Sequence, residues 1–190
     1  GIDTFYSPRK FFGLPDGGFV SSNTEFDCQL ETDNSIGRIS HLLLRIERGP
    51  EEGYDEFKKN DMLLSDQPVK KMSAFTARLL SGIDYEKCMS IRRENFQFLH
   101  SALKNVNLLT WLDNTETEVP MVYPFLIKDL LLRQKLIKSK IYIANYWPNV
   151  RQWAPENSHE QTLCEFLLPL PIDQRYGIED MKRIIEIINE

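Results

Sequence analysis

The sequence predicts an α/β protein on three observations. From residue 119 onward, strand-like and helix-like patterns alternate in the order strand, helix, strand, helix, strand, helix. Residues 72–103 carry two helical patterns separated by a glycine. Hydrophobic residues make up 42% and charged residues 27% of the 190, which excludes a disordered tail, a collagen-like repeat and a disulfide scaffold. We therefore expect a small sheet with helices packed on it.

The first 65 residues are predicted to contain a turn, a short strand and two helical segments. Residues 11–18 are rich in glycine, proline and aspartate, which is typical of a turn. A short strand over 18–22 follows, and a helix is predicted around 36–46. Gly49 and Pro50 end that helix. Residues 51–65 are acidic at first and then amphipathic.

Two helices are predicted within residues 72–103, with a break at 81–84. Gly82 can end the first helix and Asp84 can cap the second. Four charged residues of the second helix are expected on its solvated face: Arg92, Arg93, Glu94 and Lys104. Its apolar stripe has a roughly helical period and comprises Tyr85, Cys88, Met89, Phe96, Leu99 and Leu103.

The last third is predicted to build the sheet. Strands are expected over 119–127, with a proline suited to a strand start or edge, over 141–144 and over 164–168. Helices are expected over 128–138 and 158–163, with an aromatic, proline-containing loop over 145–155. A final helix presents one apolar face, formed by Ile178, Met181, Ile184, Ile185 and Ile188.

Charge and cysteine usage limit the class of protein. The formal net charge of −5 argues against nucleic acid as a partner, and no apolar run is long enough to span a membrane. Cys28, Cys88 and Cys164 lie far apart, which favours buried, reduced thiols and a cytoplasmic location. A nucleophilic cysteine is the alternative, but no histidine or basic cluster lies beside one. The scattered histidines predict no metal site.

The segment around Lys10 is the best candidate for chemistry. A lysine in a turn beside Phe11 and Phe12 can be partly desolvated, and a neutral amine of this kind forms a Schiff base with an aldehyde. Ser7 and nearby backbone N–H groups can hold a phosphate. The alternative is that Lys10 is an ordinary surface lysine.

The stretch Ser-Pro-Arg-Lys-Phe-Phe-Gly-Leu-Pro-Asp-Gly-Gly-Phe-Val, residues 7–20, resembles the cofactor-lysine segment of pyridoxal-phosphate enzymes of fold type I. It is most similar to the DegT/DnrJ/EryC1 family of sugar aminotransferases, in which a Gly-Gly pair follows the Schiff-base lysine at a short, fixed distance. Here Gly17 and Gly18 follow Lys10 by seven and eight positions. Later segments resemble the family in the same order: 91–95, 122–125, 132–137, 141–144, 167–172 and 177–181.

The resemblance implies a cofactor, a fold and a larger protein. Lys10 would form the Schiff base with pyridoxal phosphate as the catalytic residue, and Ser7 would contact the same cofactor. Residues 1–70 would end the large cofactor-binding domain, 71–105 would form interdomain helices, and 106–190 the C-terminal small domain. Because the family is about twice as long, we expect a missing N-terminal half, a homodimer, and an isolated chain that is inactive and free of cofactor.

The resemblance also implies substrates: an amino-acid donor and a nucleotide-sugar or keto acceptor. Tyr146 and Trp147 could stack on a sugar or base, and Arg151 could bind a carboxylate or phosphate. The alternative is that Trp147 and Trp153 pack the loop onto its own domain. Two other functions stay open for the whole protein: a relative of the same fold that does not transaminate, and a non-catalytic interaction or dimerisation module.

Overall fold

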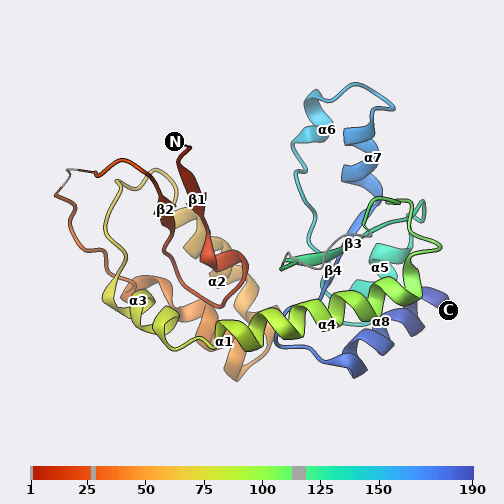
Figure 1. Cartoon of the computed structure of the whole chain (residues 1–190), viewed down its shortest axis with the longest axis horizontal. Helices are drawn as coiled ribbons and strands as arrows, with labels where there is room; N and C mark the ends of the chain where they lie inside the picture. Colours follow the sequence, from red (N-terminus) through yellow and green to blue (C-terminus); the bar gives the residue numbers. More distant parts are fainter. Residues whose placement is uncertain (1, 27–28, 113–118) are drawn as a thin grey trace. The chain divides into compact units, whose positions relative to one another are not determined.

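A computed structural model describes residues 2–26, 29–112 and 119–190. The chain divides into two compact units, residues 1–83 and 84–190, which are described one at a time. Each unit contains one two-stranded antiparallel sheet together with helices, which confirms the predicted α/β class (Figure 1). The segment expected to be interdomain, 71–105, is divided between the units. Cys28 lies outside the described residues.

The first unit begins with a small hairpin and continues with helices. In the hairpin, Thr4 pairs with Ser21 and Tyr6 with Phe19, and the loop between the strands contains a 3-10 helix. The strand predicted over 18–22 and the helix predicted over 36–46 are both present. The elements in order are β1 (Thr4–Tyr6), η1 (Pro8–Lys10), β2 (Phe19–Ser21), η2 (Ile36–Arg38), α1 (Ser40–Glu47), α2 (Pro50–Leu63) and α3 (Ala74–Ser81).

Helices α1 and α2 pack closely through a glycine. Gly53 of α2 is buried, and a Cβ atom placed there would lie 3.0 Å from the carbonyl oxygen of His41 in α1. Gly49 ends the α1 segment in a left-handed conformation with φ 99°, and Pro50 then occupies the first turn of α2, where its missing N–H costs nothing. The sequence therefore located this helix boundary correctly.

The second unit opens on the long helix α4, which begins where the sequence predicted. Asp84 caps it, since its carboxylate accepts the Lys87 N–H at 3.0 Å, and Gly82 follows the end of α3. The elements of this unit are α4 (Tyr85–Leu103), β3 (Val122–Leu126), α5 (Leu132–Lys138), α6 (Val150–Trp153), α7 (His159–Phe166), β4 (Leu167–Pro171) and α8 (Ile178–Asn189).

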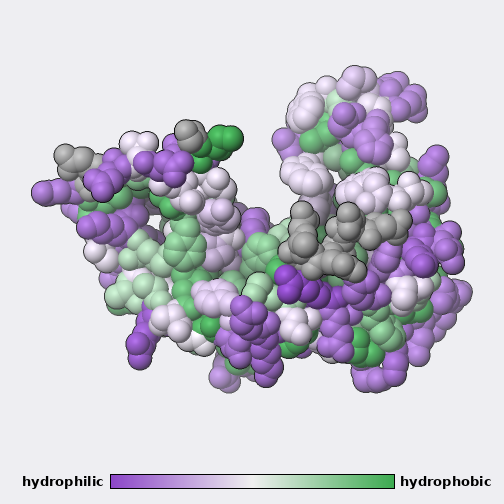
Figure 2. Space-filling model, in the orientation of Figure 1, coloured by the Kyte–Doolittle hydropathy of each residue, from purple (hydrophilic) through white to green (hydrophobic). Residues whose placement is uncertain are grey.

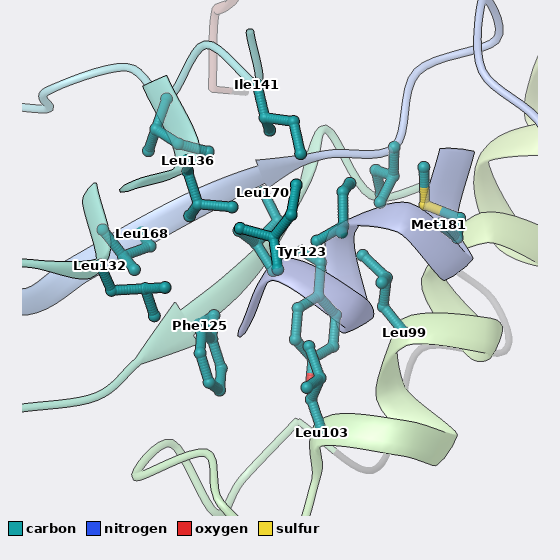
Figure 3. Packing of buried hydrophobic residues seen from close by; sticks show 14 of the residues in the cluster. Leu99, Leu103, Tyr123, Phe125, Leu132, Leu136, Ile141, Leu168, Leu170 and Met181 are labelled. Carbon is teal, nitrogen blue, oxygen red and sulfur yellow. The ribbon is translucent and has the colours of Figure 1, made fainter. Parts of the chain in front are cut away.

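The core of the second unit lies between its sheet and helices α4, α5 and α8. Figure 3 shows Leu99 and Leu103 of α4 beside the ring of Tyr123 from β3. Phe96 meets the same ring edge-on, with the ring centroids 5.1 Å apart. The predicted apolar face of α8 is confirmed in part: Met181 and Ile184 are buried, and they belong to one cluster with Leu136, Ile141, Leu168, Leu170, Ile172 and Ile187.

The sheet β3–β4 tolerates prolines in mid-strand because each of its two strands is an edge strand. Pro124 stands opposite Pro169, so the proline nitrogens, which carry no hydrogen, point to the outer edges, where no hydrogen bond between the strands is lost. Side chains cover these edges. Asn107 donates to the Pro124 carbonyl at 2.9 Å and accepts the Leu126 N–H at 3.0 Å. Arg133 donates to the Leu167 carbonyl at 2.7 Å on the other strand.

Between residues 141 and 168 the predictions are wrong at three places. Residues 141–144 form no strand: Ile141 and Ile143 are buried, but the carbonyls of residues 143 and 144 accept hydrogen bonds from the Arg133 side chain instead of a neighbouring strand. Residues 150–153 form the short helix α6 within the predicted loop. The strand predicted from residue 164 begins at 167, because Cys164 belongs to α7.

Arg92 was expected on the solvated face of α4, and this prediction is wrong. Its side chain is buried, and its guanidinium donates to Gln174 Oε1 at 2.9 Å and to the Met121 carbonyl at 3.1 Å. Asn95, one turn later, donates to the carbonyls of Ile172 and Tyr176. These two polar side chains bind α4 to the turn that precedes α8.

Large apolar side chains lie at the surface of both units. Figure 2 shows hydrophobic residues at the surface among hydrophilic ones. In the first unit Ile2, Phe5, Ile36 and Ile46 are among the most exposed, and in the second Trp111 is 74% exposed. Within the part of the chain that the structure describes, no helix combines the length and hydropathy needed to cross a membrane.

Candidate functional site

Lys10 lies on the loop that joins β1 to β2. It is the last residue of η1, and its N–H donates to the Ser7 carbonyl at 3.1 Å. The N–H groups of Phe11 and Phe12 both donate to the Pro8 carbonyl at 3.0 Å. Pro8 is buried, whereas Ser7 and Lys10 are exposed. The Lys10 amine therefore faces solvent within this unit, where the sequence had suggested partial burial beside the two phenylalanines.

The second half of the same loop is buried and anchored. Leu14, Pro15 and Asp16 are all buried. The Asp16 carboxylate accepts hydrogen bonds from Ser35 Oγ at 2.7 Å, from Thr76 Oγ1, and from Arg38 at 3.0 and 2.7 Å. These donors come from η2 and α3 and from the residue before η2. The loop that carries Lys10 is thus fixed to two other elements through one side chain.

Gly17 follows Asp16 in a conformation that only glycine adopts readily. Its φ is 96°, and a Cβ atom at this position would lie 2.9 Å from Cγ2 of Thr76. The glycine allows the chain to turn directly against α3 before it enters β2. One of the two glycines that carry the family resemblance is therefore required here by local packing.

Helix α2 holds the same loop from another direction. Asn60 is buried and donates to the Pro15 carbonyl at 3.1 Å. Arg9, the neighbour of Lys10, pairs with Asp61 at 3.3 Å, and that contact is largely exposed. The Asn60 bond is the stronger anchor of the two, because surface ion pairs contribute little to stability.

The charges around Asp16 explain how a carboxylate is tolerated in this interior. Burial raises the pKa of Asp16, but the hydrogen bonds from Thr76, Ser35 and Arg38 outweigh it, so the pKa lies below its ordinary value. Burial lowers the pKa of Arg38, while Asp16 and Asp33 together raise it above its ordinary value. Arg38 bridges the two carboxylates, with Asp33 at 2.6 Å.

Sequence reasoning missed Asp16 as a site residue. A Pro-Asp-Gly-Gly run is typical of an exposed turn, and the partners of Asp16 lie 19 to 60 residues further along the chain. Leu14, an apolar residue inside a turn sequence, was the one local signal that this segment returns to the interior. Arg38 gave no signal, since it stands alone among polar and apolar neighbours.

The residues present fit one part of pyridoxal phosphate, the cofactor that the resemblance implies. Ser7 immediately precedes η1 and Lys10 is its last residue, and both are exposed. Lys10 would hold the cofactor covalently and the Ser7 hydroxyl would contact its phosphate. Contacts to the cofactor ring have no counterpart among these loop residues. Among the described residues no group of acidic, histidine and cysteine side chains is arranged to hold a metal.

The second unit contains the other predicted site residues, Tyr146, Trp147 and Arg151. The rings of Tyr146 and Trp147 lie 5.3 Å apart, and burial raises the pKa of Tyr146. Trp147 is 60% and Trp153 67% exposed, so the alternative in which both rings pack onto their own domain is wrong. Arg151 donates to the Cys164 carbonyl at 3.0 Å, which joins α6 to the end of α7.

Arg151 lines a hollow of about 380 Å³ in this unit. Tyr146 and Trp147 do not line it. Arg133 and Arg151 are close enough there for the charge of Arg151 to add to burial in lowering the pKa of Arg133. The remaining lining is mixed, and comprises Asp129, Leu130, Ile137, Ile143, Asn145, Glu165 and Leu168.

Comparison with known proteins returned two solved structures. No family model and no curated protein matches the sequence. The fold is similar to a DegT/DnrJ/EryC1/StrS aminotransferase from Brucella abortus, with 17% identity, a TM-score of 0.48 and 72% of this chain covered. It is also similar to a Streptococcus pneumoniae protein described as a candidate sugar aminotransferase in its PMP form, with 18% identity, a TM-score of 0.48 and 73% coverage.

This chain spans 43% of the first solved structure and 44% of the second, less than half the length of each. At this level of likeness we base the function on the residues of the chain itself.

Proposed function

We propose that this chain is the C-terminal part of a pyridoxal-phosphate-dependent aminotransferase. The observation that carries the proposal is the Lys10 loop: an exposed amine on a turn whose following residues are buried and anchored, in a sequence that resembles the cofactor-lysine segment. Because the turn is anchored, it holds the Lys10 amine in one position, as covalent attachment of a cofactor requires.

Lys10 has two roles in this proposal. Its amine would hold the cofactor covalently through the cofactor's aldehyde carbon. When free, the same amine would move a proton to and from the substrate carbon as a general base. Bound pyridoxal phosphate supplies the electron sink. Ser7 holds the phosphate at the other end of the same turn.

The substrates and partners belong to the same proposal. An amino acid is the donor and a nucleotide-sugar or other keto compound the acceptor, with Arg151 contacting an anionic group and the Tyr146 and Trp147 rings a sugar or base. The preceding part of the same protein supplies the contacts to the cofactor ring, and two copies form the working dimer in the cytoplasm.

The first test is the reading frame that encodes this chain. We expect it to continue upstream for about as many residues again, without a stop codon. A frame that begins at this chain would instead favour an interaction or dimerisation module.

The second test replaces Lys10 in the full-length protein by alanine and by arginine. We expect both variants to lose visible absorbance from bound cofactor, and borohydride reduction to fix the cofactor on Lys10 in the unaltered protein. Lys138→Arg, at an exposed lysine of α5, is the matched control and should change neither readout. Turnover retained by Lys10→Arg would contradict the proposal. Cofactor binding without keto-acid release from an amino donor would identify a non-transaminating relative.

A further inference from the structure

We infer that Asp16 is the positioning residue of the Lys10 loop. Its carboxylate, held by donors from outside the loop, fixes where the turn presents the lysine amine. The inference deepens the proposed function, on which the role of Lys10 rests, and adds to it a residue that does not contact the reacting atoms.

The loop from Ser7 to Gly18 has few other fixed points. Its two ends are set by the β1–β2 pairing, which spans only three residue pairs. Between them, η1 is held by its own local hydrogen bonds, which a 3-10 turn makes with poor geometry, and by the largely exposed pair of Arg9 with Asp61. A two-stranded hairpin of this length is marginal by itself, so the position of η1 depends on contacts made by the rest of the loop.

Asp16 supplies the largest number of those contacts. Its two carboxylate oxygens accept from Ser35, from Thr76 and twice from Arg38. Arg38 presents two nitrogens, Nε and Nη2, to the same carboxylate oxygen, and hydrogen bonds to a charged acceptor are about twice as strong as neutral ones. Ser35 also contacts Ser73 Oγ, which caps the start of α3 through the Thr76 N–H.

Asp16 can restrain Lys10 because only a short stretch of chain connects the two residues. Asp16 is separated from Lys10 by five residues, of which Leu14 and Pro15 are buried and cannot swing freely. On the other side of Asp16, Gly17 packs closely against Thr76. If the Asp16 anchor is lost, this buried part of the loop can leave α3, and η1 moves with it.

Asp33 offers a matched control within the same cluster. It pairs with the same guanidinium, through Arg38 Nη2 at 2.6 Å, and lies near Lys70 at 3.8 Å. It lies outside the Lys10 loop. Asp16→Asn and Asp33→Asn therefore remove the same charge from the same arginine, but only the first variant loosens the loop.

The first readout is amide hydrogen exchange of residues 9–14 in the chain as it stands. We expect Asp16→Asn to speed the exchange of these amides about tenfold, while exchange in α4 and α8 stays unchanged. Asp33→Asn should leave residues 9–14 within about twofold of the unaltered chain. Equal acceleration by both variants, or none with Asp16→Asn, would overturn the inference.

The second readout is the rate at which borohydride fixes pyridoxal phosphate on Lys10 in the full-length protein. We expect Asp16→Asn to slow this rate by about 10- to 100-fold, because misplacing a reacting group by about 1 Å has effects of this size. Asp33→Asn should retain the rate. Thr76→Val, which removes one donor and keeps the shape, should give a smaller loss of about threefold and replaces Asp16→Asn if that variant does not fold.

The two readouts separate the inference from the proposed function. If Lys10 of the unaltered protein takes up no cofactor while the exchange results are as expected, the proposed function fails and the anchoring by Asp16 stands. If Lys10 is labelled but neither variant changes exchange or labelling, the proposed function stands and the inference fails.

Discussion

At the scale of single residues, Asp16 and Arg38 show how a charged pair is accommodated inside a small unit. Removing a carboxylate from water is costly unless hydrogen bonds and an opposite charge replace the lost solvation. Asp16 receives four hydrogen bonds and Arg38 contacts two carboxylates, so neither charge is buried alone. Breaking this pair is therefore expected to cost more than breaking the exposed pair of Arg9 with Asp61.

The lowered pKa of Asp16 makes the first unit sensitive to acid. In the unfolded chain this carboxyl has its ordinary pKa, near 3.8, and in the folded unit the pKa is lower. The stabilisation is fully present above the unfolded value and is lost as the pH falls through the folded value. We expect the difference in unfolding free energy between the unaltered chain and Asp16→Asn to be about 1–3 kcal/mol at pH 7 and to shrink below pH 4.

Urea unfolding followed by circular dichroism at several pH values measures this difference. The groups that face Asp16 are Arg38, Ser35 and Thr76, and of these only Arg38 is charged and it does not titrate in this range. Asp33 pairs with the same guanidinium of Arg38, so Asp33→Asn serves as the second reference. A difference that stays constant from pH 7 to pH 3 would show that the Asp16 carboxylate is not the group responsible.

At the scale of secondary-structure elements, the sequence predicted the features that depend on neighbouring residues. It did not predict the features that depend on a partner far along the chain. The break between α3 and α4 was predictable because Gly82 and Asp84 act on their own neighbours. Pairing of residues 141–144 was not, because a strand exists only with a partner, and here the Arg133 side chain takes the partner's place. Helical periodicity likewise could not reveal that Arg92 meets carbonyls about 29 residues away.

The same scale explains what was and was not predictable at the candidate site. Lys10 and Ser7 were predicted as site residues because a contiguous segment resembles a family. The anchor at Asp16 was not, because its donors come from residues 35, 38 and 76 and converge only after folding. The exposure of Trp147 and Trp153 depends in the same way on packing rather than on residue type.

Helix α4 should depend on the buried guanidinium of Arg92. In Arg92→Ala, the Met121 carbonyl and the Gln174 side chain lose a charged donor in a buried place, and packing of the side-chain stem is lost as well. We expect a loss of about 3 kcal/mol in unfolding free energy, measured by urea denaturation. Glu94→Ala, at an exposed position of the same helix, should change it by less than about 0.5 kcal/mol. Equal effects of both variants would refute the role of Arg92.

At the scale of the whole molecule, the two units differ in how much apolar surface they cover. The second unit has a continuous core built on both strands and three helices, with Tyr123, Phe125 and Leu170 fully buried. In the first unit every residue of β1 and β2 is exposed. Exposed apolar surface of this kind marks a surface that another protein segment covers.

We therefore expect this chain to self-associate through the β1–β2 hairpin. Phe5 pairs with Val20 in register, and they are 80% and 45% exposed. Light scattering should show an apparent mass that rises with concentration for the unaltered chain, and a lower, constant mass for the double variant Phe5→Ser, Val20→Ser. Thr4→Ala, at a polar position of the same hairpin, is the control and should still associate. An unchanged rise in the double variant would place the contact elsewhere.

The positions of the tryptophans have a consequence for spectroscopy. Trp111, Trp147 and Trp153 are the three tryptophans of the chain; all lie in the second unit, and all are more than half exposed. Their emission already comes from rings in contact with water, and unfolding changes that contact little. Intrinsic tryptophan fluorescence therefore reports little on the unfolding of either unit. A ligand that shields Trp147 from water would change the emission more than denaturation does.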